Sequence, residues 1–149
     1  MPDLYDKDFV AWSETQAEAL RRLADHRPDL AAELDFVHLI EEVEDMAIST
    51  ARELRNRLSV LLAHLAKWRW QKGLRTRSWQ NTVVEQRGQV GDLLDDNPSL
   101  RPRLEAILAK AWRLARRRAG YETGLGQDAF PEACPFTIEQ ALDEGFWPD

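Results

Sequence analysis

The sequence predicts an all-α protein, an antiparallel bundle of four main helices with a long second helix and an irregular C-terminal tail that carries one short helix. Three observations predict this class. Apolar residues recur at steps of three and four in four separate segments, which is the helical period. No segment alternates with the period of a β-strand. Short connections join the second, third and fourth segments, and short connections favour antiparallel neighbours.

The first two helices are predicted from their caps and their apolar periodicity. Asp6 or Asp8 can cap the first helix, which we expect to end near His26, before Pro28. Asp35 is the expected N-cap of the second helix, predicted over 36–72. Its apolar residues repeat at steps of three and four with no Gly or Pro to interrupt them. A helix of that length would span roughly 55 Å.

Glycines and a proline delimit the third and fourth helices. The third is predicted from Thr76 or Ser78 to about residue 94, and we interpret Gly88 and Gly91 as points where another helix approaches closely. The fourth is predicted to begin at 98, where Asn97 can act as the N-cap, and to end at Gly120 or Gly124. These last assignments follow the usual cap preferences.

The tail, residues 125–149, is aromatic, acidic and rich in proline. Thr137 and Gln140 have capping-box spacing, so they predict a short helix that ends before Gly145. We expect the aromatic side chains to pack back on the bundle, because such a density of exposed rings would favour aggregation. The elements together are predicted to form a single helical domain over residues 1–149.

Composition excludes several classes of protein. The chain has 149 residues, a net charge of −6, 44% apolar residues and a single cysteine. It therefore resembles neither a disordered segment nor a disulfide scaffold. It has no apolar run of membrane-spanning length and no signal-peptide pattern at its start, so we expect a soluble cytoplasmic protein with no membrane partner.

The charge is divided into three blocks. Residues 1–50 hold 13 acidic and 4 basic side chains, residues 51–120 hold 6 and 16, and residues 121–149 hold 7 and 0. Two explanations remain open at this point. The acidic ends can pair with the basic centre inside the fold, or the centre can bind an anionic partner.

A basic, tryptophan-rich run lies at the predicted corner between the second and third helices. Cations neutralise phosphates and indole rings stack on bases, so the run is a candidate anion or nucleic-acid site. The alternative is that these cations stack on the indoles or pair with other helices. A second run, Arg113 with Arg116–Arg118, is explained by the dipole at the end of the fourth helix, and it would support the anion site if it lay beside the first run. The candidate residues of the first run are Lys67, Arg69, Lys72, Arg75 and Arg77.

An acidic cluster on the second helix is the candidate metal site. Glu41, Glu42 and Asp45 share one side of that helix with His38, and such carboxylates can hold Mg²⁺ or Mn²⁺. A solvated acidic face explains the same pattern.

The spacing E-E-x-x-D resembles the first motif of the all-α nucleoside triphosphate pyrophosphatases of the MazG type. Asp92 and Asp95 would have to supply the second acidic motif of that family, but the usual glutamate is missing and the lysine context is absent.

Two single residues have plain structural interpretations. His64 lies beside the apolar face of the second helix and is predicted to be hydrogen-bonded and partly buried. Cys134 has no cysteine partner and is predicted to be a small buried thiol.

Short segments along nearly the whole chain carry a family resemblance. The chain resembles the bacterial domain-of-unknown-function 29 family, which implies a compact helical protein. The resemblance implies no activity, cofactor or catalytic residue. The segments are Leu4–Asp6, Asp8–Phe9 with Trp12, Leu39–Glu44, Leu61–Leu62, His64–Trp68, Ser78–Trp79, Arg87, Pro98–Leu100, Glu122–Leu125, Phe130–Pro131 and Cys134–Pro135.

The sequence thus favours a non-enzymatic protein-interaction module, because the charge is segregated and no convergent catalytic set is present. Nucleic-acid binding is the lesser option. The alternative is a metal-dependent nucleotide or phosphate-ester hydrolase with its acidic site on the second helix. No catalytic residue and no cofactor is predicted, and a divalent cation is expected only under that alternative.

Overall fold

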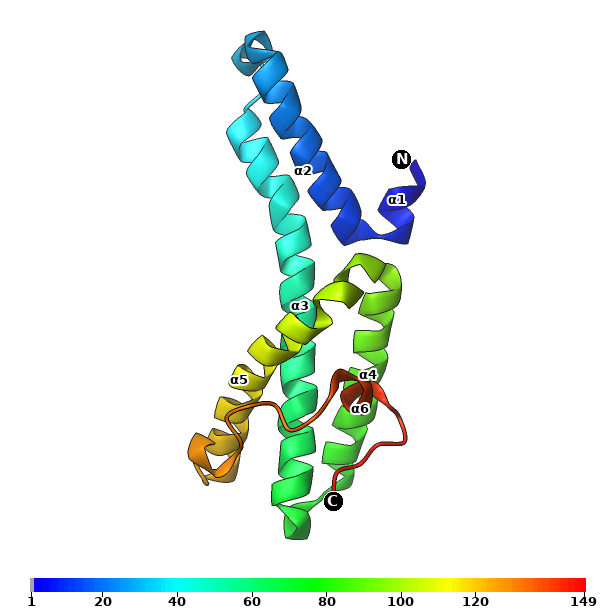
Figure 1. Cartoon of the computed structure of the whole chain (residues 1–149), viewed down its shortest axis with the longest axis vertical. Coiled ribbons are helices and arrows are strands. Elements are labelled where there is room, and N and C mark those ends of the chain that lie inside the picture. The colour runs from blue at the N-terminus through cyan, green and yellow to red at the C-terminus, as the bar shows by residue number, and fades with distance from the viewer. Residues whose placement is uncertain (1) are drawn as a thin grey trace. The chain divides into compact units, whose positions relative to one another are not determined.

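The structure, a computed structural model that describes residues 2–149, confirms the all-α class (Figure 1). Four of its α-helices are long, and the described residues contain no strand. The α-helices are α1 (Pro2–Lys7), α2 (Phe9–His26), α3 (Phe36–Trp70), α4 (Arg77–Asp96), α5 (Leu104–Thr123) and α6 (Ile138–Leu142). The connections contain four 3₁₀ turns, η1 (Pro28–Ala32), η2 (Lys72–Leu74), η3 (Pro98–Arg103) and η4 (Gln127–Ala129).

Backbone contacts divide the chain into two compact units. Unit 1 consists of the residues up to Arg52 together with Leu94–Arg101, and unit 2 consists of Glu53–Leu93 together with Pro102–Asp149. The long helix α3 contributes its first half to unit 1 and its second half to unit 2.

The Asp8 carboxylate anchors unit 1. Its Oδ1 accepts a 2.9 Å hydrogen bond from the backbone N–H of Ala11, which confirms Asp8 as the N-cap of α2. The same carboxylate accepts hydrogen bonds from the backbone N–H and the hydroxyl of Ser99, at 2.7 and 2.8 Å. The Ser13 hydroxyl on α2 donates to the carbonyl of Val43 on α3. Polar contacts therefore hold α2 and its N-cap against α3 and η3 within unit 1.

Unit 2 contains the larger apolar core. Residues from the second half of α3, from α4 and from α5 are fully or almost fully buried there. The turn η2 joins α3 and α4, and Figure 1 shows the two helices running in opposite directions on either side of it. The largest of these buried side chains are Leu54, Leu58, Leu61, Leu62, Leu65, Val83, Val90 and Trp112.

Two details differ from the expectation. The predicted fourth helix begins as the 3₁₀ turn η3, and regular α-helix starts only at Leu104, because Pro102 has no N–H to donate. Helix α1, which precedes the first predicted helix, was not expected.

The interpretation of Gly88 and Gly91 was wrong. A Cβ at either position would meet no described atom within 4 Å. The close approach occurs at Gly120, where a Cβ would lie 2.4 Å from the backbone nitrogen of Gln127.

The tail packs back on unit 2, as expected. Thr137 and Gln140 form the predicted capping box at the start of α6. Trp112 on α5 donates a 3.0 Å hydrogen bond from its indole nitrogen to the carbonyl of Pro131. Its ring also makes an edge contact with the ring of Phe136, with 6.3 Å between the centroids. The tail is therefore held against α5 by these contacts.

Candidate functional site

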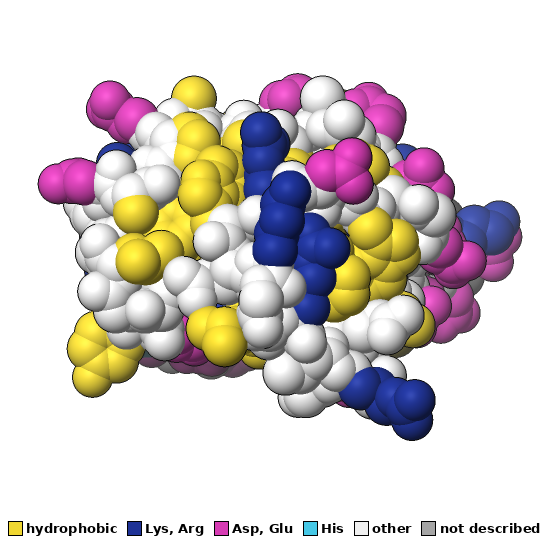
Figure 2. Space-filling model, turned by 90° about the horizontal axis from the view of Figure 1, so that it is seen from below, with side chains coloured by type: hydrophobic (Ala, Val, Ile, Leu, Met, Phe, Trp, Pro, Cys, Tyr) yellow, Lys and Arg dark blue, Asp and Glu magenta, His cyan; other side chains and the backbone are white. Residues whose placement is uncertain are grey.

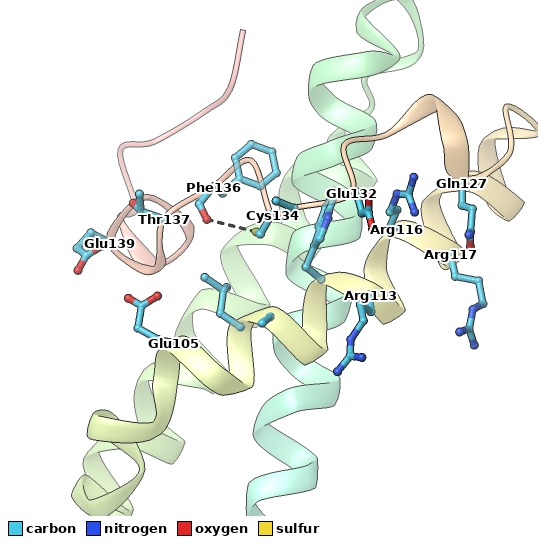
Figure 3. A pocket seen from close by; sticks show the side chains of 14 residues that line it. Glu105, Arg113, Arg116, Arg117, Gln127, Glu132, Cys134, Phe136, Thr137 and Glu139 are labelled. Atoms are coloured by element: carbon cyan, nitrogen blue, oxygen red, sulfur yellow. Dashed lines mark hydrogen bonds between the residues drawn. The ribbon is translucent and has the colours of Figure 1, made fainter.

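A groove of about 720 Å³ lies between α5 and the tail, entirely within unit 2 (Figure 3). One side of the groove is formed by residues of α5 that recur at steps of three and four, so a single face of this helix lines the groove. Its other side is formed by the tail. Its lining includes Glu105, Trp112, Arg113, Arg117, Glu132, Cys134 and Glu139.

The charges of the groove are separated along its length. Glu105 and Glu139 lie together at one end, and Arg113 and Arg117 lie toward the other (Figure 3). A third glutamate, Glu132, lies next to Arg116 on the tail side. Neither Arg113 nor Arg117 forms an ion pair or a hydrogen bond with the residues that the structure describes. Arg116, between them in sequence, donates a 2.9 Å hydrogen bond to the carbonyl of Phe130 and so helps to hold the tail. The two unpaired guanidinium groups are available to an anionic ligand.

The only cysteine of the chain lies in this groove. Cys134 is half-buried, and its thiol donates a 3.3 Å hydrogen bond to the carbonyl of Phe136. Burial raises the pKa of the Cys134 thiol, so the unreactive thiol form predominates at neutral pH. The arrangement fits ligand binding better than nucleophilic catalysis.

A second, smaller cavity of about 340 Å³ lies where the ends of α3 and α5 meet the start of α4. Lys67 and Glu122 form an ion pair across it, with 2.8 Å between Nζ and Oε2. The side chain of Lys67 is only 9% exposed, whereas that of Glu122 is 40% exposed. The Lys67 ammonium also lies 5.0 Å from the centre of the Trp79 ring, a cation–π contact.

His64 lines the same cavity as a neutral ring. Its Nδ1 lies 2.8 Å from the carbonyl of Val60, and since a carbonyl only accepts, Nδ1 must carry the proton. Burial is the largest cause that lowers the pKa of His64, and the positive charges of Lys67 and Arg118 lower it further. The unprotonated Nε2 is therefore an acceptor.

The predicted basic run is divided between internal and exposed positions. Lys67 is buried in the ion pair described above. Arg75 donates to the carbonyls of Trp68 and Pro148 at 2.8 and 3.2 Å and stacks on the Trp68 ring, with 4.7 Å between Cζ and the ring centre. Arg69 is exposed over the ring of its neighbour Trp70, at 4.8 Å, and Lys72 and Arg77 are exposed. The structure therefore leaves three of these five cations at the surface.

Figure 2 looks at the end of the structure that carries the α3–α4 corner. Lys and Arg side chains form a short row there, between patches of apolar side chains. Leu74 in η2 is exposed, and so are Tyr121 and Leu125 at the end of α5.

The cation that donates hydrogen bonds to the most carbonyl groups, Arg87, is not one of the predicted site residues. Arg87 on α4 is buried, and its guanidinium donates to four carbonyls of α6 and the tail. Two of these bonds are short, 2.8 Å to Ala141 and 2.7 Å to Phe146. In this part of unit 2 the basic block therefore binds the acidic tail through its backbone carbonyls.

The predicted metal ligands lie exposed on the first half of α3. No group of three or more His, Cys, Asp or Glu side chains suited to a metal ion is found among residues 2–149. Asp95 is paired with Arg101 at 2.9 Å, and His38 is hydrogen-bonded to Asp35 at 2.6 Å. The metal interpretation of Glu41, Glu42 and Asp45 therefore gains no support from the geometry and stays a prediction from the sequence.

Fold and grooves together define a helical protein with ligand-sized hollows and no recognisable catalytic centre among the described residues. The chain belongs to the family described as "Domain of unknown function DUF29", whose model matches residues 4–147. It is similar to a crystal structure of an α-helical protein of unknown function from Rhodospirillum rubrum, with 28% identity and a TM-score of 0.69. That match covers 95% of this chain and 90% of the other.

No curated protein matches the chain. No described helix combines the length and the apolar character that crossing a membrane requires.

Proposed function

We propose that this protein is an interaction module that binds a short segment of another protein in the groove between α5 and the tail. The observation that carries the proposal is the separation of charge along that groove. Two unpaired arginines stand toward one end and two glutamates at the other, with Ala109 and the half-buried Cys134 between them. A third glutamate, Glu132, lies next to Arg116 on the tail side. A ligand of matching pattern would meet complementary charge at both ends.

The dimensions favour a short extended peptide. Glu105 and Arg117 are twelve positions apart on α5, which corresponds to about 18 Å at the rise of an α-helix. An extended chain covers that distance with about six residues. The expected segment has an acidic residue near Arg113 and Arg117, an apolar residue over the exposed Ala109, and a basic residue near Glu105 and Glu139.

A displayed peptide library tests the proposal, because the selected sequences report the order of charges. We expect enrichment of peptides in which acidic, apolar and basic residues follow one another along about six positions. Synthetic versions of the selected peptides should slow the reaction of Cys134 with a thiol reagent, since that cysteine lies in the groove and has no competitor in the chain.

Charge reversals supply the controls for that experiment. The double variant Arg113→Glu, Arg117→Glu should lose binding of the acidic-to-basic peptides. Lys110→Glu should retain it, because Lys110 is exposed on the same helix but does not line the groove. Selection of no peptide, or equal binding by all three proteins, would contradict the proposal.

A second candidate function is favoured by three exposed cations around the α3–α4 corner. Arg69, Lys72 and Arg77 remain exposed there, and Trp70 lies beside Arg69. Such a surface suits the phosphates and bases of a single strand. Titration of labelled single-stranded RNA at two salt concentrations tests it, and binding absent at low salt or indifferent to salt would exclude this function.

A further inference from the structure

We infer that the cavity between His64, Lys67 and Glu122 is a binding site for a small zwitterion, an α-amino acid. This inference is independent of the peptide groove, since the two hollows share no lining residue. It rests on the kinds of polar group that the cavity presents and on its size.

The cavity presents opposite charges within reach of one small molecule. The ammonium of Lys67 uses one of its three N–H groups on Glu122, at 2.8 Å. The second carboxylate oxygen of Glu122 accepts no hydrogen bond from the described residues. A carboxylate can therefore bind at the ammonium while an ammonium binds at the carboxylate, and both formal charges of the cavity remain paired.

Two neutral groups extend this pattern. His64 Nε2 is an acceptor, because its Nδ1 proton is donated to Val60. Gln71 also lines the cavity, and its side chain forms no hydrogen bond with the described residues. The ligand ammonium has a second acceptor in His64, and the ligand carboxylate has a second donor in the amide of Gln71.

The volume of the cavity and its apolar lining limit the size and kind of ligand that fits. About 340 Å³ is at the small end of ligand pockets, which run from about 300 to 1,000 Å³. Leu74 and Trp79 provide the apolar part of the lining. A single amino acid with an apolar or aromatic side chain suits this space better than a nucleotide does.

Calorimetric titration with each of the twenty standard α-amino acids at pH 7.5 tests the inference. We expect at least one apolar or aromatic amino acid to bind. Its N-acetyl derivative lacks the ammonium and its amide lacks the carboxylate, so each should bind at least tenfold more weakly. These ligand changes delete one charge at a time without altering the protein.

Protein variants then locate the site. Glu122→Gln removes the carboxylate charge at a partly exposed position and should weaken binding at least tenfold, as should His64→Phe. Glu85→Gln, at an exposed position of α4 that lines neither hollow, is the matched control and should bind as the native protein does. Thermal unfolding of each variant confirms that it is folded.

Three outcomes would overturn the inference. The first is that none of the twenty amino acids binds at millimolar concentration. The second is that the N-acetyl derivative binds as tightly as the parent, which would indicate a simple carboxylate site. The third is that a folded Glu122→Gln variant binds unchanged. Failure of the peptide-groove experiment leaves all three readouts unaffected.

Discussion

Arg87 Nη2 lies 2.7 Å from the carbonyl oxygen of Phe146, and the two residues are 59 positions apart in the chain. The same guanidinium lies 5.4 Å from the centre of the adjacent Trp147 ring. A planar cation with five N–H donors can serve several carbonyls at once, which a lysine ammonium cannot do in the same geometry. One arginine on α4 therefore fixes both the end of α6 and the residues that follow it.

Replacement of Arg87 by methionine should destabilise the protein by about 3 kcal/mol. Hydrogen bonds to charged groups contribute about 1.5–3 kcal/mol each, and the carbonyls of Ala141 and Phe146 would lose their short bonds. Urea denaturation measures the loss. Limited proteolysis should also cut the variant near residues 143–149 sooner than the native chain.

Arg77→Met is the control for this prediction, because Arg77 is an exposed arginine on the same helix. It should change the free energy of unfolding by less than about 0.5 kcal/mol. Equal stability of the two variants would mean that Arg87 does not hold the tail.

Replacement of Asp8 by alanine should cost about 2 kcal/mol. The carboxylate caps α2 and also binds Ser99 through two hydrogen bonds, so the variant loses a helix cap together with a contact between distant segments. Chemical denaturation reports the difference. Asp6→Ala, which removes an exposed carboxylate two residues earlier, should be nearly neutral, and an equal loss there would refute the role of Asp8.

The features predicted correctly from sequence are those that depend on neighbouring residues. Asp8 at the start of α2 and the Thr137–Gln140 capping box are local, and the long apolar face of α3 needs no knowledge of its partners. The predicted start of α5 lies six residues before the observed one, because Pro98 fits the first position of either helix type whereas Pro102 has no N–H for an α-helical bond.

The features missed depend on what packs against a residue. Gly88 and Gly120 look alike in the sequence, yet only Gly120 has backbone next to its Cα. One side of the groove follows from the sequence, because its residues from Glu105 to Arg117 recur at steps of three and four along one helix. The other side is formed by the tail, whose position depends on tertiary packing. The role of Arg87 is indicated by its position in the sequence, since a charged residue on the apolar face of a helix needs buried hydrogen-bond partners.

Two of the three histidines allow a test of local charge. The pKa of His64 is lowered chiefly by burial, whereas the pKa of His38 is raised chiefly by its hydrogen bond to Asp35. In a proton NMR titration, His64 should therefore titrate below 6.5 and His38 above it. Single substitutions assign the two resonances, and the reverse order would contradict the described environments.

The lowered pKa of His64 makes the stability of the protein depend on pH. A folded pKa below the unfolded value means that the folded state prefers neutral His64, so this contribution is complete above pH 6.5 and is lost as the pH falls toward the folded pKa. His64→Gln should flatten the curve of unfolding free energy against pH in that range. The raised pKa of His38 has the opposite effect on the pH dependence of stability. Because His38 is exposed, that effect should be slight.

Two glycine-to-alanine substitutions should change stability in opposite directions. At Gly120 the new Cβ would lie 2.4 Å from Gln127 N and 2.6 Å from Gly126 C, both backbone atoms, so η4 would have to move away from α5. Overpacking of this kind costs about 1–3 kcal/mol. At Gly88, exposed within α4, a Cβ meets no described atom within 4 Å, and alanine should stabilise the helix by about 0.5–1 kcal/mol. Thermal and urea unfolding of both variants measure the difference, and a stabilised Gly120→Ala would show that α5 and η4 are not in contact.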